Sequence, residues 1–335
     1  MLTQILKQHY GVKVSEPIKL SRYDAFKSSK GLYIVVKGGN LTEEVIGELH
    51  LMAEHLHFQG DRFVSMFVPS KEGRLLSEWE NEKLCVLVNR VLERPVQKKM
   101  GRKLAKFHYR GRSISSQIRN NSRVGQWKQL WEQRLEQIEN VWNERIFQSP
   151  ENDFERMFLE SFPYFMGLTE NAIQYLVDTE LDDNPNINDN GTVCHERFSK
   201  QTWGDIYTVK NPFDWVFDHS SRDLAEWTRE HYFQNKQIYQ PDLNLFYADY
   251  QTISPLSSFS WRLLYSRLLF PLHYFECIEH YYITVSEQQK KLHEEKIEQL
   301  LRYSGEYEQF LSSFFDVVEA PTRKYKIPKL KWLKK

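Results

Sequence analysis

Apolar and polar residues follow two different patterns along the chain. In the first ninety residues the apolar positions form short runs, at residues 18–22, 33–36, 62–69 and 84–91. The first run alternates apolar and polar residues, and the second is rich in β-branched residues between glycine-containing turns. Such runs predict β-strands, with a turn at residues 71–73.

One helix interrupts these predicted strands. Asn40 is followed three residues later by Glu43, which is the spacing of a helix-starting capping box. The apolar residues that follow recur at helical spacing and form one stripe: Leu41, Val45, Leu49, Met52 and Leu56. Strands, one helix and further strands predict a small lobe of mixed α+β structure that ends near residue 92.

Beyond Pro95 the pattern becomes mostly helical. Residues 96–109 and 126–143 each carry an apolar face, and helices resume after residue 218 almost to the end. Residues 182–191 are rich in Asp and Asn, with one Pro and one Gly, and predict a loop. We therefore divide the chain into an N-lobe, residues 1–92, and a helical C-lobe, residues 93–335.

Composition narrows the functional classes. The chain has 335 residues with 45 basic and 45 acidic side chains, so its formal net charge is zero and nucleic acid is an unsuitable partner. Cys85, Cys194 and Cys277 lie far apart, which predicts neither a metal site nor disulfides. No apolar run approaches the length of a membrane span, so we expect a soluble, intracellular protein without a transmembrane segment.

Lys37 and Glu48 are the first candidate functional residues. Lys37 ends a predicted strand, and Glu48 lies at the edge of the apolar stripe of the following helix. A half-buried carboxylate needs a cation, and in kinases a strand lysine and a helix glutamate form such a pair at the nucleotide phosphates. The alternative is an exposed strand-end lysine beside an ordinary amphipathic helix.

Residues 194–198 (CHERF), followed by Asp214, form the second candidate. Small-molecule kinases of the aminoglycoside and choline type carry a His-Gly-Asp-x-x-x-x-Asn loop there, and a second Asp about twenty residues later. The spacing from His195 to Asp214 fits, at 19 residues. Arg197, however, stands where the catalytic base is expected, and Thr202 stands where the metal-binding Asn is expected.

Several further motifs occur in one order along nearly the whole chain. They are LAKFH (104–108), GQW (125–127) with EQRL (132–135), CH (194–195), Asp214, RDLA (222–225), and LFP (269–271) with HYY (280–282). In this order they resemble the CotS-type spore coat family, which is similar in fold to aminoglycoside phosphotransferases. The resemblance implies a bilobal, protein-kinase-like α+β fold, with a small mixed N-lobe and a large, mainly helical C-lobe.

The resemblance also implies roles for single residues. Lys37 matches the nucleotide-phosphate lysine with Glu48 as its partner, His195 the histidine of the catalytic loop, and Asp214 the magnesium ligand. Asp223 matches an aspartate that family members place at a helix start. Arg197 and Thr202 depart from the pattern, because a guanidinium cannot act as a base near neutral pH and a hydroxyl replaces an amide carbonyl.

These departures favour a kinase-like protein that has lost catalysis. Our leading hypothesis is a pseudokinase with a structural or assembly role in sporulation, made in the cytoplasm of the mother cell and placed on the spore coat, with other coat proteins as partners. We expect Arg197 to pair with Asp214 or with a bound phosphate and to hold a fixed cleft.

Two alternatives stay open. One is an ATP-dependent small-molecule phosphotransferase in which Asp205 or Asp218 replaces the missing base. The other retains Mg-ATP as a structural ligand without phosphoryl transfer. Neither the oligomeric state nor a phosphoryl acceptor follows from the sequence.

The last fifteen residues, 321–335, carry seven basic and no acidic side chains. Terminal segments of this composition are typically mobile, and we expect that here. Interleaved aromatic and aliphatic residues would suit docking on an acidic partner or an anionic surface, while a solvated extension is the simpler interpretation.

Overall fold

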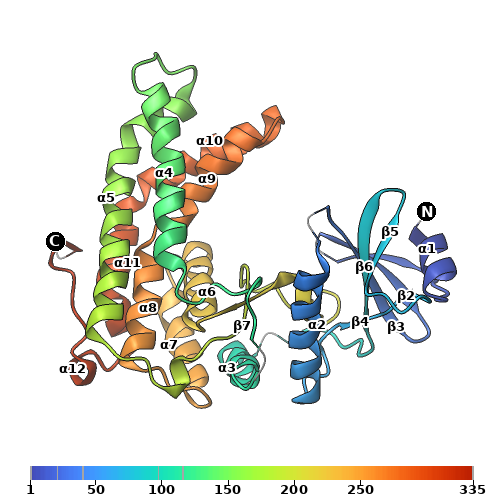
Figure 1. Ribbon diagram of the computed structural model, residues 1–335. Coiled ribbons are helices and arrows are strands. Elements are labelled where there is room, and N and C mark those ends of the chain that lie inside the picture. Colours follow the sequence, from blue (N-terminus) through green and yellow to red (C-terminus); the bar gives the residue numbers. More distant parts are fainter. Residues whose placement is uncertain (1, 21, 40, 97, 115–116, 334–335) are drawn as a thin grey trace. The chain divides into compact units, whose positions relative to one another are not determined.

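The computed structural model describes residues 2–20, 22–39, 41–96, 98–114 and 117–333. It has the predicted fold class, with a small antiparallel sheet in the N-lobe and a mainly helical C-lobe (Figure 1). Two compact units can be distinguished. The first comprises residues 1–124, 190–230 and 249–254, and the second comprises residues 125–189, 231–248 and 255–335.

The sheet of the first unit is antiparallel in the order β1-β2-β3-β6-β4, with β5 also pairing with β6. Its strands are β1 (Pro17–Leu20), β2 (Tyr23–Ser28), β3 (Gly31–Lys37), β4 (Met66–Phe67), β5 (Leu76–Trp79) and β6 (Glu82–Asn89). The four predicted strand regions all contain strands, whereas β2 and β5 were not predicted. The N-lobe boundary at residue 92 stays a prediction; β6 ends at Asn89 and the next helix begins at Met100.

One face of this sheet packs against α1 (Leu2–His9), a helix that the sequence pattern did not reveal. Ile5 and Leu6 of α1 form a buried cluster with Tyr33 and Val35 of β3 and with Leu84 of β6, among others. Successive strand residues point to opposite faces, so residues 33, 35 and 37 share the face that carries α1. Residues 32, 34 and 36 share the other face.

The predicted helix after β3 is α2 (Glu43–Phe58). Its N-cap is Thr42, whose hydroxyl accepts the N–H of Val45. Asn40, the predicted start, lies outside the described residues. The buried side is close to the predicted stripe, with Leu49, Met52 and Leu56 fully buried alongside Ile46 and Ala53.

The rest of the first unit is built around α3 (Met100–Gly111) and a two-stranded antiparallel ribbon of β7 (Thr192–His195) and β8 (Trp215–Asp218). A short 3-10 helix, η2 (Pro212–Asp214), leads into β8, and α6 (Ser221–Gln234) follows it. Gly111 brings α3 close to β7, because a Cβ at this position would lie 2.5 Å from the Thr192 Oγ1 and 2.7 Å from the Val193 N.

The second unit is helical. Its elements include α4 (Trp127–Arg145), α5 (Asp153–Asp182), α8 (Ser258–Leu269), α9 (Leu272–Ile283), α10 (Glu287–Arg302) and α11 (Ser304–Val317), and α7 (Tyr239–Gln251) runs from this unit into the first. Aromatic residues fill its core: Trp131 stacks on Phe270, and Phe165 stacks on Tyr274 at a ring separation of 3.7 Å. The predicted loop at residues 182–191 contains one short 3-10 helix, η1 (Ile187–Asp189).

The basic tail is packed rather than extended into solvent as far as residue 333. It contains α12 (Thr322–Tyr325) and η3 (Lys331–Leu333), and Ile327 and Leu333 are buried. The Tyr175 hydroxyl of α5 donates to the Pro328 carbonyl. The expectation of a mobile tail is therefore wrong for these residues, because two apolar side chains fix it on the helices.

Two of the helical glycines, Gly111 and Gly167, should respond oppositely to substitution by alanine. A methyl group at residue 111 collides with the backbone of β7, so we expect Gly111→Ala to destabilise by about 1–3 kcal/mol. At Gly167 in α5 nothing lies within 4 Å of the new Cβ. The better helix propensity of alanine should therefore stabilise the folded protein by up to about 1 kcal/mol. Thermal unfolding of both variants tests this; a lower melting temperature for both, or for neither, would contradict it.

Candidate functional site

A cavity of about 420 Å³ in the first unit contains several of the predicted site residues. The end of β1, the turn after it and the start of β2 contribute Leu20, Arg22 and Tyr23, and β3 contributes Ile34. The segment after β7 contributes, among others, Arg197, Thr202, Asp205 and Asp214. We call this cavity the cleft. The structure thus brings together four of the candidate residues.

Asp214 is held by the N-lobe. Its Oδ1 accepts hydrogen bonds from the Tyr23 hydroxyl at 2.8 Å and from the Arg22 guanidinium at 2.9 Å. Burial raises the pKa of the Asp214 carboxyl, and the bonds from Tyr23 and Arg22 offset this effect only in part. The predicted magnesium ligand therefore already has a cation and a hydroxyl donor from the protein itself.

Arg197 and Thr202 stand at the positions where the resemblance implies a catalytic base and a metal-binding Asn. The Arg197 guanidinium donates to the neighbouring Glu196 carbonyl and lies 3.9 Å from the Glu226 carboxylate, with about 46% of its side chain exposed. The expected Arg197–Asp214 pair does not form, because Asp214 is bonded to Arg22 and Tyr23. The Thr202 hydroxyl closes a local turn, accepting from the Ser199 N–H and donating to the Arg197 carbonyl.

Lys37 and Glu48 are not brought together. Lys37 pairs with Glu82 of β6 at 2.5 Å. Because it shares the α1 face of the sheet, Lys37 is directed away from Ile34, which lines the cleft. The residue of β3 that shares the face of Ile34 at this end of the strand is Val36, which is buried.

Glu48 binds a loop instead. Its two carboxylate oxygens accept the backbone N–H groups of Arg119, Asn120 and Asn121, at 2.9–3.0 Å. Burial opposes the charged form of Glu48, but these hydrogen bonds outweigh it and lower the pKa of the carboxyl. The predicted Lys37–Glu48 pair is therefore wrong as a contact, and the cofactor-binding role given to the two residues has no support in their placement.

The two possible substitute bases differ in position. Asp205 is exposed and lines the cleft. Asp218, at the end of β8, is fully buried; its Oδ2 accepts from the Arg222 guanidinium at 2.9 Å and its Oδ1 from the His219 N–H. Only Asp205 can therefore reach a molecule in the cleft.

The first unit also contains a buried polar cluster of His108, His195 and Asp223. Asp223 Oδ2 accepts the His195 Nδ1–H at 2.7 Å and the His108 Nε2–H at 3.0 Å, and Oδ1 accepts the His195 backbone N–H. Trp203 donates its indole N–H to the His195 Nε2. This donor fixes the His195 tautomer, because an indole N–H cannot accept.

His108 is in the opposite tautomer. Its Nε2–H points to Asp223, and its Nδ1 accepts from the Tyr250 hydroxyl at 2.8 Å. Burial lowers the pKa of His108 to about 4, although Asp223 acts against this shift. In Asp223 burial works against ionisation, but the two histidines outweigh it and lower the pKa of the carboxyl.

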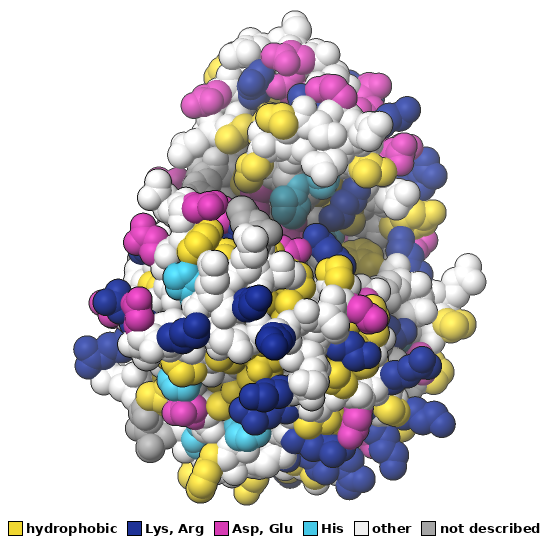
Figure 2. Space-filling view, turned by 90° about the vertical axis from the view of Figure 1, so that its right-hand side faces the viewer, with side chains coloured by type: hydrophobic (Ala, Val, Ile, Leu, Met, Phe, Trp, Pro, Cys, Tyr) yellow, Lys and Arg dark blue, Asp and Glu magenta, His cyan; other side chains and the backbone are white. Residues whose placement is uncertain are grey.

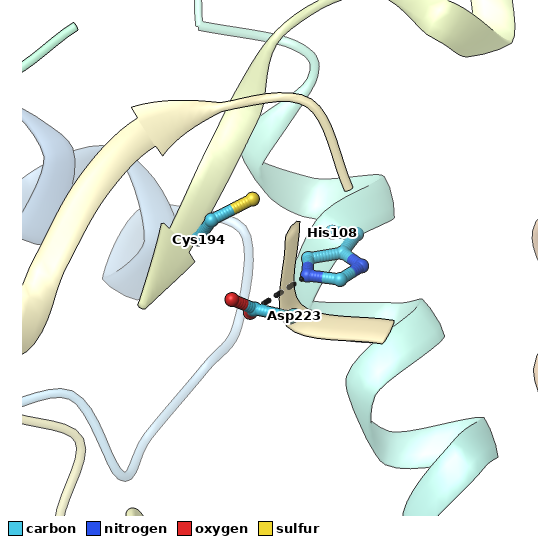
Figure 3. Close-up of side chains that lie close together, drawn as sticks. All are labelled: His108, Cys194 and Asp223. Atoms are coloured by element: carbon cyan, nitrogen blue, oxygen red, sulfur yellow. Dashed lines mark hydrogen bonds and ion pairs between the residues drawn. The ribbon is translucent and has the colours of Figure 1, made fainter. Parts of the chain in front are cut away.

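His108, Cys194 and Asp223 also have the residue types and the proximity of a metal site. Figure 3 shows the imidazole and the carboxylate facing each other, with the thiol on the neighbouring strand β7. Both oxygens of Asp223 and both nitrogens of His108 already have hydrogen-bond partners. Burial also raises the pKa of the Cys194 thiol, which opposes the thiolate that a metal needs. The cluster is therefore a structural one.

Comparison with known proteins decides the family. The family model described as "Spore coat putative kinase YutH" matches residues 3–314. The endospore coat-associated protein YutH of Bacillus subtilis (strain 168) is 40% identical over 342 residues, covering all of this chain and 99% of its own. The chain belongs to the YutH family of kinase-like spore coat proteins. This confirms the resemblance drawn from the ordered motifs.

Solved structures confirm the fold of this YutH-family chain. An aminoglycoside phosphotransferase of Alicyclobacillus acidocaldarius superposes with a TM-score of 0.66 at 13% identity, covering 91% of this chain and 93% of its own. The AMP-bound spectinomycin phosphotransferase APH(9)-Ia gives 0.61 at 14% identity, with 96% and 98% coverage. A microcompartment-associated aminopropanol kinase gives 0.60 at 13% identity, with 95% and 98% coverage.

The contacts of the cleft include residues that the sequence did not point to. Arg22 and Tyr23 carried no recognised motif, since the turn before β2 lacks the Gly-rich loop of protein kinases. Asp223 was predicted only from the family resemblance. In the structure it is buried between two buried histidines and holds the start of the loop that follows His195. His108 lay in the LAKFH motif, and its position on the buried face of a helix is the signal that could have revealed it.

The protonation of His108 should make stability depend on pH. The unfolded imidazole titrates near 6.5 and the folded one near 4, so between these values the unfolded chain binds more protons. Stability should therefore fall as pH is lowered from about 6.5 to 4, by up to roughly 1.4 kcal/mol per pH unit from this group. The carboxylate of Asp223 would contribute only at lower pH.

Urea unfolding at pH 7, 6 and 5 measures this slope. His108→Gln should flatten it, whereas His57→Gln, at an exposed histidine of α2, should leave it unchanged. Equal slopes for the parent and His108→Gln would show that another group carries the dependence.

Proposed function

We propose that this protein associates with the endospore coat in a structural or assembly role and does not transfer phosphate. Its family supports the coat association. One observation supports the loss of catalysis above others: Asp214, the expected magnesium ligand, is bonded to Arg22 and Tyr23 in a cleft whose base position holds Arg197. Other coat proteins made in the mother cell are the partners that this role implies.

Mg-ATP does not fit the residues present. A magnesium ion bound through Asp214 Oδ1 would compete with the Arg22 guanidinium and the Tyr23 hydroxyl for that oxygen. The Thr202 hydroxyl is engaged in its own turn, and Lys37 lies on the opposite face of the sheet from Ile34. Charge neutralisation of phosphates by metal and lysine is the core of phosphoryl transfer in kinases. The donor set needed for it is not assembled here.

A second candidate function is that of an active small-molecule phosphotransferase, and the position of Asp205 supports it. Asp205 is exposed and lines the same cavity as Asp214, so a carboxylate is available as a base. This alternative requires that a metal bind the other oxygen of Asp214, or that Arg22 and Tyr23 release Oδ1 when a nucleotide enters.

Nucleotide binding distinguishes these proposals. We expect the melting temperature of the protein to stay unchanged on addition of about 1 mM ATP with magnesium, and no release of ADP above background. A ligand present at 100 times its dissociation constant would raise the free energy of unfolding by about 2.7 kcal/mol and the melting temperature by several degrees. A magnesium-dependent shift, with ADP release that Asp205→Asn abolishes, would establish the active kinase instead. A shift without ADP release would indicate a structural nucleotide.

Assembly onto the coat provides an independent test. In sporulating cells that lack the native protein, a fluorescent fusion should reach the spore coat equally well as parent, Asp214→Asn or Asp205→Asn. The reason is that a structural role needs the folded surface and not these two carboxylates. The control is Asp223→Asn, which should lower the amount of folded fusion because it leaves buried histidine groups unpaired. Loss of coat signal in Asp214→Asn, with unchanged thermal stability, would contradict the proposal.

A further inference from the structure

A second cavity, of about 450 Å³, shares one lining residue with the cleft, Gly204. Its walls come from residues 60–63 after α2, residues 93–96 between β6 and α3, one side of α3, and the loop at residues 200–210. Small-molecule sites are commonly concave and between about 300 and 1,000 Å³. The cavity therefore has the dimensions of a ligand site.

Part of the lining is apolar. The apolar residues that border the cavity are Phe63, Pro95, Val96, Met100 and Trp203. The Trp203 ring is fixed, because its N–H donates to His195 and the Lys210 ammonium lies 4.3 Å from its centre. A rigid aromatic wall beside aliphatic side chains favours a ligand with a flat apolar body.

The polar part of the lining has an excess of positive charge. Seven of the lining residues are Lys or Arg, and two, Asp61 and Glu93, are acidic. Both carboxylates are already used: Asp61 accepts from Lys210 at 2.6 Å and from Arg110 at 3.0 Å, and Glu93 pairs with Arg62. They therefore cannot neutralise the remaining cations.

Three cations of the lining have no carboxylate partner among the residues that the structure describes: Arg94, Lys103 and Lys106. Lys103 is half-buried, and its ammonium donates to the Val96 carbonyl. Burial lowers the pKa of Lys103, as expected for an ammonium that has left water without gaining a counter-ion. An anion in the cavity would supply that counter-ion.

We propose that this cavity binds a small organic anion with two negative charges on a flat apolar ring. The charges lie against Arg94, Lys103 and Lys106, and the ring lies against the apolar lining. Both aryl phosphates and aromatic dicarboxylates have this chemistry. The site does not depend on the loss of phosphoryl transfer in the cleft, so it stands or falls separately from that proposal.

Calorimetric titration of the full chain tests the class of ligand. The probes are phenyl phosphate, benzene-1,3-dicarboxylate, inorganic phosphate and phenol. We expect at least one of the two aromatic dianions to bind at least tenfold more tightly than inorganic phosphate, and phenol not to bind. The better of the two identifies phosphate or carboxylate as the source of charge. Binding should weaken as sodium chloride rises from about 50 to 300 mM, because exposed charges are screened.

Matched double variants locate the binding. Lys103→Gln with Lys106→Gln should weaken binding of the better probe at least tenfold. Lys98→Gln with Arg102→Gln removes the same charge from exposed residues outside the lining and should change binding less than threefold. Melting temperatures without ligand show whether each variant is folded. If the first pair unfolds, the exposed Lys106→Gln alone should still weaken binding about threefold or more.

Three results would overturn the proposal. One is the absence of binding by both aromatic dianions at millimolar concentration. Another is equal loss in the two double variants, which would mean attraction by net charge rather than by the cavity. The third is equal affinity for inorganic phosphate and the aromatic dianions, which would exclude the apolar ring from recognition.

Discussion

The carboxylate of Asp223 is the interaction on which the first unit depends. It joins three elements that are distant in sequence: His108 on α3, His195 at the end of β7, and its own helix α6. All of these groups are buried, so each would otherwise leave a polar atom without a partner, at a cost of about 1–3 kcal/mol each. The position of the loop after His195, and with it one wall of each cavity, follows from this carboxylate.

Polar groups of the cleft are likewise hydrogen-bonded by other groups of the protein. In an active kinase the polar groups of the cleft are completed by nucleotide, metal and substrate. Here Oδ1 of Asp214 is bonded to Arg22 and Tyr23, and the Thr202 hydroxyl to its own turn. Glu48, which does not line the cleft, binds the backbone of residues 119–121. Basic side chains do not compensate. Many Lys and Arg side chains lie on the face drawn in Figure 2, but Lys37, one of seven basic residues among the first 37, binds Glu82. The fold has been kept while its polar groups bond to one another.

The sequence predicted those parts that depend on local periodicity. Helices α2 and α4 and strands β3 and β6 have clear patterns, and the fold class followed from them together with the ordered motifs. The direction of Lys37 was not accessible, since it depends on which face of the sheet α1 covers, and α1 has only eight residues. The partners of Asp214 lie about 190 residues away along the chain, in a turn without a recognisable motif. Pairings of that separation are set by tertiary structure alone.

The alternation along β3 has an evolutionary consequence. A lysine at residue 37 cannot turn toward the cleft by changing its rotamer, because a strand shows one side chain to each face in turn. A phosphate-binding lysine on the face of Ile34 would require replacing Val36, whose side chain is buried. The intermediate would carry an ammonium in an apolar interior, a state that costs several kcal/mol without a paired anion. The packing of the core therefore opposes any single substitution that would place a lysine of β3 on that face.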